Sequence, residues 1–366
     1  MKLTSSTLGK IILCKSPDTT ICEQAIISLY KSAKTALSKT VICTFASLAI
    51  FTLASIDLSA NSIDPVGTCS NDIVYANYIA NHQTGTNPNG TFSNDPVPGK
   101  PKGKLYIIGG GSRPVTMIRQ IAELSGTTQS GYAFVLPMSS GEPESAIERA
   151  KNDFYSVGVK KVTGFNFRSD SNLGASNDNI ASELYLKMID SLRNAKLIYI
   201  PGGVQSNFMS AIKNTAVAEA IHYAYQNGAL ISGTSAGAAV MSRLMITGNQ
   251  LNPRPGNGYV TIAQNNMELE EGLGLLQDVI IDQHFIMRQR LNRLVSVAIE
   301  YPETLCIGID ESTAIIVDGD IATVAGESQV IVIKNQNGKK AILNGLLGAK
   351  NMELSVYLPG ECFKLK

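Results

Sequence analysis

Short apolar runs alternate with amphipathic segments from residue 104 onward, and this alternation limits the fold more than any other feature of the chain. The apolar runs are continuous, as in strands that are buried on both faces of a sheet. The expected strands are 104–108, 132–137, 161–165, 196–200 and a strand from 229; the expected helices are 115–124, 142–157, 179–194 and 215–226. The pattern predicts an α/β fold with a mostly parallel sheet, right-handed crossovers and helices on both faces.

The chain changes character after about Leu305. Apolar runs at 313–317, 321–324 and 329–333 are separated by Asp318-Gly319-Asp320 and by Gly326-Glu327, which are turn signals for hairpins. We therefore expect an antiparallel C-terminal extension in which two hairpins join these three runs.

The region ahead of the domain contains a charge-free apolar run at 41–56, with lysines upstream and a possible cleavage point after Ala60. The run is short for a membrane span and suits a signal peptide, so we expect export to the periplasm or medium. An uncleaved anchor and a start codon assigned too far upstream are the alternatives, and the protein would be cytoplasmic if the run 41–56 is not a signal. The chain then divides into this N-terminal region (1–60), a flexible linker rich in Asn, Gly and Pro (61–103) and a folded domain (104–366).

Composition excludes several classes of function. The 366 residues are 44% hydrophobic with a net charge of +1, which fits one sizeable core and provides no basic surface for nucleic acid. The six cysteines show no C-x-x-C spacing and only three histidines are present, so we expect no metal and no cofactor. Cys306 is expected in the core, and a disulfide between Cys69 and Cys362 is left open.

The strand from 229 ends in Gly233-Thr234-Ser235-Ala236-Gly237, a small-residue turn with a central hydroxyl. A G-x-S-x-G turn between a strand and a helix, here expected at 238–244, is typical of a nucleophile elbow. The turn would also place the N–H of Ala236 near a helix N-terminus, where it can meet an oxyanion. An ordinary tight turn with a solvated serine is the alternative.

Two glycine turns follow other strands. Gly109-Gly110-Gly111 lacks the G-x-G-x-x-G spacing and any Walker lysine, so we reject a nucleotide site there. Gly202-Gly203 follows the strand 196–200. Because parallel strands end at one edge of a sheet, this second turn and Ser235 should border the same crevice.

A serine nucleophile needs a base, and the chain offers three histidines. His82 lies in the linker and His222 on a helical stripe, which leaves His284 just after the strand 279–283. An orienting carboxylate is also needed. Asp282 is too near in sequence, whereas Asp310 and Glu311 follow the apolar run 305–309, and the pattern does not choose between them.

Three segments in order carry a resemblance: Gly233–Ala238, Ile281–Phe285 with its downstream arginines, and Gly308–Ala314. From about Lys104 to the C-terminus the chain resembles the cyanophycinases, which are serine peptidases related to dipeptidase E. The resemblance implies a fold like that of class I glutamine amidotransferases, which is flavodoxin-like. It also implies Ser235 as nucleophile, His284 as base and Glu311 as orienting acid.

The same resemblance implies an oxyanion hole from the N–H groups of Gly203 and Ala236. A further set of residues would shape the substrate pocket: Gln205, Asp282, Gln283, Arg288, Arg290 and Arg293. A helix with three arginines is expected after His284, and Arg288, four residues beyond His284, would lie on the same helical side. Solvated or salt-bridged helix positions are the alternative for Arg290 and Arg293.

The implied substrate is cyanophycin, a poly-aspartate whose side chains carry arginine, and the implied products are β-Asp-Arg dipeptides. An aspartyl dipeptidase of the dipeptidase E type and a non-catalytic binding relative are the alternatives. The arginines after His284 argue against the first, and the presence of Ser235, His284 and a carboxylate argues against the second. The resemblance also implies a homodimer.

Overall fold

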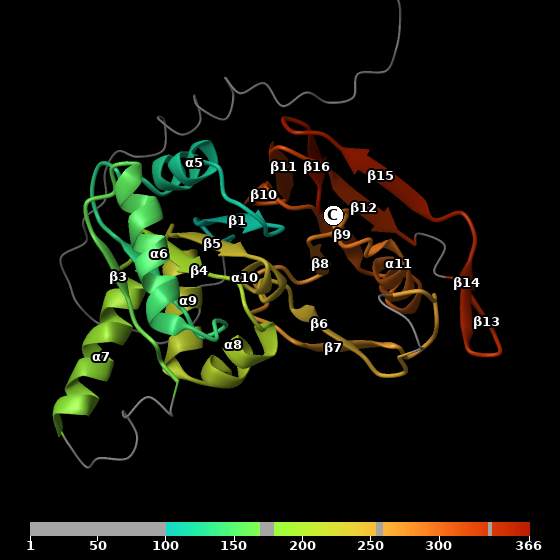
Figure 1. Ribbon diagram of the computed structural model, residues 1–366, viewed down its shortest axis with the longest axis horizontal. Coiled ribbons are helices and arrows are strands. Elements are labelled where there is room, and N and C mark those ends of the chain that lie inside the picture. The colour runs from blue at the N-terminus through green and yellow to red at the C-terminus, as the bar shows by residue number, and fades with distance from the viewer. Residues whose placement is uncertain (1–99, 169–178, 254–258, 336–338) are drawn as a thin grey trace, which may run out of the picture. The chain divides into compact units, whose positions relative to one another are not determined.

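The computed structural model describes residues 100–168, 179–253, 259–335 and 339–366 (Figure 1). The predicted signal or anchor segment, His82, Cys69 and nearly all of the predicted linker lie outside these ranges. Within them, no helix has both the length and the apolar character that a membrane span requires.

The helices of this part are α5 (Val115–Ser125), α6 (Pro143–Ser156), α7 (Asn179–Arg193), α8 (Gln205–Ile212), α9 (Ala216–Gln226), α10 (Ala236–Ala239) and α11 (Leu291–Glu300). The strands of its first half are β1 (Lys104–Ile108), β2 (Ala133–Val135), β3 (Val162–Gly164), β4 (Leu197–Ile200), β5 (Leu230–Thr234), β6 (Leu244–Gln250), β7 (Met267–Glu271) and β8 (Val279–Gln283). The remaining strands are β9 (Leu305–Ile309), β10 (Thr313–Asp318), β11 (Ile321–Gly326), β12 (Val330–Lys334), β13 (Lys340–Leu343), β14 (Leu346–Ala349), β15 (Glu353–Tyr357) and β16 (Cys362–Lys364).

The main sheet has eight strands in the order β16-β11-β10-β1-β5-β4-β2-β3. The five strands from β1 to β3 in that order pair in parallel, and β10, β11 and β16 extend the sheet antiparallel beyond β1. The predicted α/β fold with an antiparallel C-terminal extension is therefore confirmed. Since β5 lies between β1 and β4, the turns after these three strands meet at one edge of the sheet.

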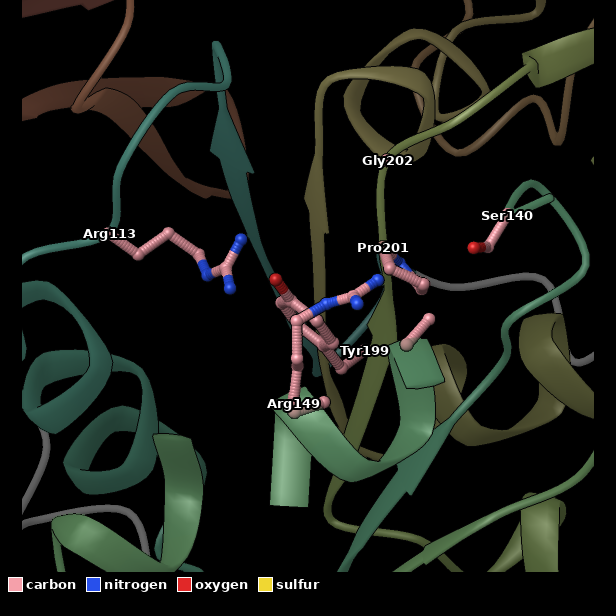
Figure 2. Close-up of a pocket in the computed structure, with 8 residues that line it drawn as sticks. Arg113, Ser140, Arg149, Tyr199, Pro201 and Gly202 are labelled. Carbon is pink, nitrogen blue, oxygen red and sulfur yellow. The ribbon is translucent and has the colours of Figure 1, made fainter. Parts of the chain in front are cut away.

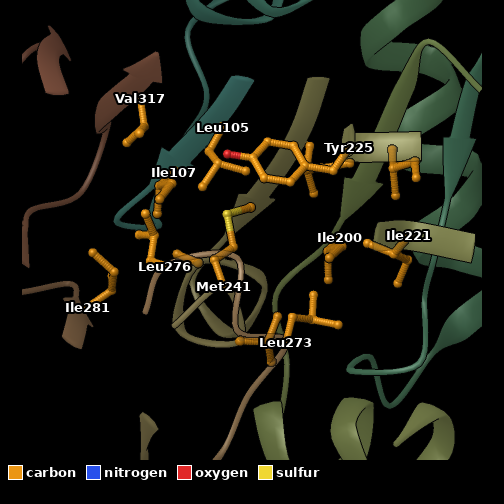
Figure 3. Packing of buried hydrophobic residues seen from close by; sticks show 14 of the residues in the cluster. Leu105, Ile107, Ile200, Ile221, Tyr225, Met241, Leu273, Leu276, Ile281 and Val317 are labelled. Carbon is orange, nitrogen blue, oxygen red and sulfur yellow. The ribbon is translucent and has the colours of Figure 1, made fainter. Parts of the chain in front are cut away.

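Helices cover both faces of the parallel half. Alternate residues of β1 point to opposite faces, so that Leu105 and Ile107 pack with α9 while Tyr106 and Ile108 pack with α5. Figure 3 shows the first of these clusters, where Met241 lies among residues from β1, α9 and the loop before β8. The edge that carries the turns is thus held by core packing on both sides.

A second, four-stranded sheet has the order β15-β12-β9-β8, and α11 packs against it through Leu294 and Val297. The predicted hairpin between the runs 321–324 and 329–333 is wrong. Strand β11 pairs with β10 and β16, whereas β12 pairs with β9 and β15 in the second sheet. The sequence pattern predicts that each run is a strand, but it does not determine which strand pairs with which. Strand β9 pairs with β8 along one edge, and β12 pairs with its other edge.

The predicted helix 238–244 is also corrected. Helix α10 ends at Ala239, and Leu244 begins β6. Between them the backbone N–H of Arg243 donates to the carbonyl of Leu276 at 2.8 Å, and Oγ of Ser242 accepts from the N–H of Ile281 at 3.1 Å. These tertiary hydrogen bonds replace the helical ones. Helix α8 and the β6–β7 hairpin were not expected from the sequence.

Two cysteines fall within the described residues. Cys306 is free and fully buried in β9, and burial raises the pKa of its thiol to about 12, as expected for a core residue. Cys362 is disulfide-bonded. Since Cys306 is free, the partner of Cys362 lies outside the described residues, and the pairing with Cys69 stays a prediction.

Candidate active site

Ser235 occupies the sharp turn between β5 and α10, with a backbone φ of 54° and ψ of −110°. The neighbouring glycines make this turn possible. A Cβ on Gly233 would lie 2.5 Å from the carbonyl carbon of Gly237, and one on Gly237 would lie 2.9 Å from that of Ile200. Because any side chain at either position would collide with backbone, the small residues of the motif are a steric requirement.

His284 and Glu311 lie beside Ser235 and come from the second sheet. His284 directly follows β8, and Glu311 lies two residues after β9, which is the parallel neighbour of β8. The Nε2 atom of His284 is 2.8 Å from Oγ of Ser235, and its Nδ1 atom is 2.5 Å from Oε1 of Glu311. A carboxylate can only accept, so Nδ1 carries the proton and Nε2 is the acceptor for the serine hydroxyl.

The structure distinguishes the two carboxylates that the sequence left open. Asp310 accepts from the N–H groups of Ile286 and Met287 at 3.1 and 2.9 Å, and from Oγ of Ser328 at 2.9 Å. It therefore supports the turn after His284, whereas Glu311 contacts the imidazole itself.

The glycine turn after β1 holds both segments. The carbonyl of Gly109 accepts from the N–H of His284 at 2.7 Å, and that of Gly110 accepts from the N–H of Ser312 at 2.9 Å. A Cβ on Gly110 would lie 2.5 Å from Nε2 of His284, and one on Gly111 would lie 2.7 Å from Cβ of Glu311. Sequence reasoning considered this turn only as a nucleotide loop. Three consecutive glycines at a strand end were the available signal for close backbone approach.

Burial lowers the pKa of His284, which is 7% exposed. The hydrogen bond to Glu311 opposes this shift, and the nearby charge of Arg288 adds to it. The imidazole is thus neutral at pH 7 and able to accept a proton.

The turn after β4 lies next to Ser235. A Cβ on Gly202 would lie 3.8 Å from Oγ of Ser235, and Gly203 has a φ of 143°. Among the described residues, the N–H groups of Gly203 and Ala236 donate to no acceptor. Free donors in this place are what an oxyanion hole needs.

Arg288 lies in a turn, which corrects the expectation that all three arginines lie on a helix, since α11 begins only at Leu291. The side chain is exposed, and its Nε atom is 4.0 Å from Oε1 of Glu311. Arg288 is therefore near the site because of the turn, and the argument from a shared helical side is wrong.

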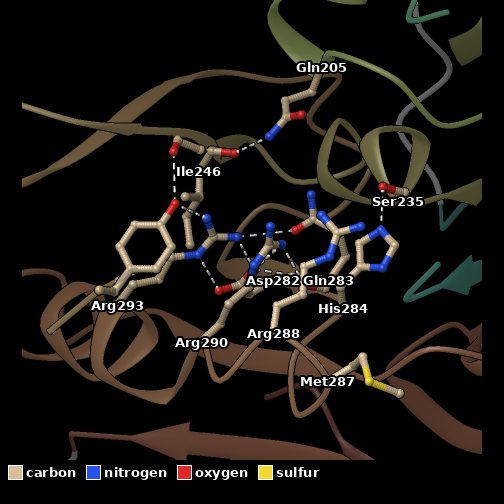
Figure 4. A network of polar contacts seen from close by, with 12 residues as sticks. Gln205, Ser235, Ile246, Asp282, Gln283, His284, Met287, Arg288, Arg290 and Arg293 are labelled. Carbon is tan, nitrogen blue, oxygen red and sulfur yellow. Dashed lines mark hydrogen bonds and ion pairs between the residues drawn. The ribbon is translucent and has the colours of Figure 1, made fainter. Parts of the chain in front are cut away.

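Asp282, Arg290 and Arg293 form a polar network behind the site (Figure 4). Asp282 and Arg293 are both fully buried, and Nε of Arg293 donates to Oδ2 of Asp282 at 2.7 Å while Nη2 donates to Oδ1. The ion pair outweighs burial and raises the pKa of Arg293, whereas burial lowers that of Arg290. Neither Asp282 nor Arg293 is accessible to a ligand in this structure, so they act on a pocket only through neighbouring groups.

The two glutamines are buried as well. Nε2 of Gln205, at the start of α8, donates to the carbonyl of Ile246 at 2.7 Å. The carbonyl of Gln283 accepts from Nη1 of Arg290 at 2.6 Å, and its side-chain oxygen is 3.4 Å from Nη2 of Arg293. The network thus fixes the backbone of Gln283, the residue that precedes His284.

His222 is half-buried on α9, where burial lowers its pKa, and it takes no part in the site. No group of three or more His, Cys, Asp or Glu side chains in the part of the chain that the structure describes could hold a metal ion.

The sequence matches a peptidase family and is similar to curated members of it. The model of peptidase family S51 matches residues 105–325. Curated cyanophycinases of Trichormus variabilis and Synechococcus elongatus are each 29% identical, over 74% and 63% of this chain and 88% and 69% of their own.

Solved structures that resemble this chain include a peptidase from an acI-B1 Actinobacterium, with a TM-score of 0.49 and 20% identity over 73% of this chain and 98% of that one. A putative peptidase E protein from Listeria monocytogenes EGD-e has a TM-score of 0.41 and 17% identity over 62% and 99%. The family match spans more than half of the sequence and includes Ser235, His284 and Glu311. The chain therefore belongs to peptidase family S51, and it is a serine-type peptidase.

Proposed function

We propose that this peptidase hydrolyses cyanophycin to β-Asp-Arg dipeptides through an acyl-enzyme on Ser235. The observation that carries the proposal is the chain of contacts from Ser235 through His284 to Glu311, at 2.8 and 2.5 Å. The similarity to curated cyanophycinases supports the substrate.

In the proposed reaction, Oγ of Ser235 attacks the scissile carbonyl carbon and Nε2 of His284 takes the hydroxyl proton. The free N–H groups of Gly203 and Ala236 stabilise the oxyanion. The C–N bond then breaks, and His284 gives its proton to the departing amine. Water, deprotonated by His284, attacks the acyl-enzyme and releases the acid product together with the serine hydroxyl.

Glu311 accepts a hydrogen bond from Nδ1–H of His284 throughout, which holds the imidazole in one orientation and stabilises its charged form. Arg288 is exposed beside Glu311, where its guanidinium can pair with a carboxylate of the substrate. Asp282, Arg290 and Arg293 would contribute by holding Gln283 and the turn that carries His284.

The experiment that tests the proposal is release of β-Asp-Arg from purified cyanophycin by the full chain, beside Ser235→Ala. We expect dipeptide from the wild type and a loss of about a thousandfold or more in the variant. Undiminished release by Ser235→Ala would refute the assignment of the nucleophile. If the wild type releases nothing but a fluorophosphonate still labels Ser235, the substrate is wrong, and dipeptides with N-terminal aspartate become the next substrates to assay.

A second proposal concerns location. The apolar run 41–56 lies outside the described residues, and its length and lack of charge support export by a signal sequence. N-terminal sequencing of the protein recovered from cell fractions tests this: a start near Asn61 outside the cytoplasm is expected, and an uncleaved cytoplasmic chain would contradict it.

A further inference from the structure

A cavity of about 220 Å³ borders the active site. Gly202 lines it, and this is the same glycine whose Cβ would lie 3.8 Å from Oγ of Ser235. The other polar residues that line it are Arg113, after β1, Ser140, after β2, Arg149, on α6, and Tyr199, on β4. The cavity therefore opens beside the nucleophile on the face of the sheet that α5 and α6 cover.

Two buried polar atoms of this cavity have no hydrogen-bond partner among the described residues: the Tyr199 hydroxyl and Nε of Arg113. Tyr199 is 2% exposed, and burial raises its pKa to about 12, so its hydroxyl keeps its proton and can donate. A buried donor without a hydrogen-bond partner destabilises the folded state. Two such donors at one cavity indicate an acceptor that is supplied from outside the chain.

The charges point to the sign of that acceptor. Nη2 of Arg113 pairs with Asp153 at 2.8 Å, while Nη1 of Arg149 donates only to the neutral Oγ of Ser145, at 2.5 Å. The described residues thus provide two guanidinium groups and one carboxylate. In the view of Figure 2, the Tyr199 hydroxyl lies between the two guanidinium groups. The site offers donors and one uncompensated positive charge.

We propose that this cavity is a subsite for a carboxylate group of the substrate, held by the Tyr199 hydroxyl, Arg149 and Arg113. A guanidinium would be repelled, whereas a carboxylate can accept from all three side chains at once. The volume suits a carboxylate with a few carbon atoms, since sites for drug-sized ligands are about 300–1,000 Å³. The inference rests on the proposed function, because in cyanophycin the α-carboxylate of each arginine is free and lies beside the poly-aspartate chain that is cleaved.

Binding is tested without turnover. The melting temperature of the full chain is followed with succinate, with uncharged succinamide and with inorganic phosphate, all at one ionic strength. A ligand that binds only the folded state raises the melting temperature. The variants are Tyr199→Phe, which removes only the unsatisfied hydroxyl, and Arg149→Met. The matched control is Arg119→Met, which removes an exposed arginine of α5 outside the cavity.

We expect succinate, and not succinamide, to raise the melting temperature of the wild type and of Arg119→Met. The affinity for succinate derived from these shifts should be at least tenfold weaker in Tyr199→Phe and Arg149→Met. Equal succinate effects in all four proteins, or no effect in the wild type, would overturn the proposal. Stronger binding of phosphate than of succinate at this site would overturn the choice of a carboxylate.

Kinetics complete the test. On a substrate of two linked β-Asp-Arg units, Tyr199→Phe should lower kcat/KM about tenfold through KM, and on the matching argininamide substrate it should change nothing. An equal loss on both substrates would contradict the subsite. If succinate binds as expected but cyanophycin is not cleaved, the proposed substrate fails while the anion site stands.

Discussion

Gly110 and His284 are in such close contact that a Cβ on the glycine would lie 2.5 Å from Nε2 of the imidazole. The turn after β1 therefore sets the position of the base as much as β8 does. Gly110 has a φ of 118°, a conformation that other residues rarely adopt. Strand order places this turn between the nucleophile and the orienting acid, because β1 lies between β5, which precedes Ser235, and β10, which follows Glu311.

Gly110→Ala should lower kcat/KM by about a hundredfold, since the methyl group would displace His284 from Ser235 and a misplacement of about 1 Å can cost that much. Gly158→Ala is the matched control: its φ is 94° and no atom lies within 4 Å of the added Cβ. Both variants carry the backbone strain of a positive φ, so both should be less stable. Equal activity in the two variants would show that the contact does not position the base.

Glu311→Gln should lower kcat by about 10³–10⁴-fold, because an amide can donate to Nδ1 and so favour the wrong tautomer. Asp310→Asn is the comparison, since Asp310 accepts from the N–H groups of Ile286 and Met287 and makes no contact with the imidazole. It should mainly lower the melting temperature. Kinetics and thermal unfolding are measured on both variants. If Asp310→Asn proved to be the inactive one, Asp310 and not Glu311 would be the orienting acid.

The acid limb of kcat/KM against pH should have its midpoint below pH 6.5, because burial lowers the pKa of His284 from that value. Stability follows the same sign: the unfolded chain binds the proton more readily, so the contribution of this group falls as pH drops below about 6.5. Arg288→Met removes a charge that lowers the pKa and should move the midpoint upward. A midpoint that is unchanged in Arg288→Met, as in Arg119→Met, would argue against this coupling.

Arg293→Met should destabilise the fold by about 3–5 kcal/mol, because it leaves the charge of Asp282 buried without its partner. Arg288→Met should change stability by less than about 1 kcal/mol, since that side chain is exposed and its contact with Glu311 is 4.0 Å. Urea unfolding measures both. Similar losses of unfolding free energy in the two variants would contradict the assignment of Arg293 as buried and Arg288 as accessible.

Several features could be predicted because they depend on local sequence. The alternation of apolar runs and amphipathic segments predicts the parallel sheet, since side-chain periodicity reports directly on burial. Gly233-Thr234-Ser235-Ala236-Gly237 predicts the strained turn, because only small residues fit there. The rule that parallel strands of one sheet end at one edge brings the turns after β4 and β5 together, but it does not account for His284, since β8 lies in the second sheet.

Other features are decided only in the tertiary structure. Asp310 and Glu311 are neighbours in sequence with equal chemistry, and only the crossing of the Gly109–Gly111 turn places one against the imidazole and the other under the turn after His284. The same holds for the burial of Arg293 and for the cavity beside Gly202, whose side chains come from four separate segments. Periodicity determines which face of its own element a residue occupies, but hydrogen bonds and ion pairs depend on distances between elements, which are set when the sheets and helices pack.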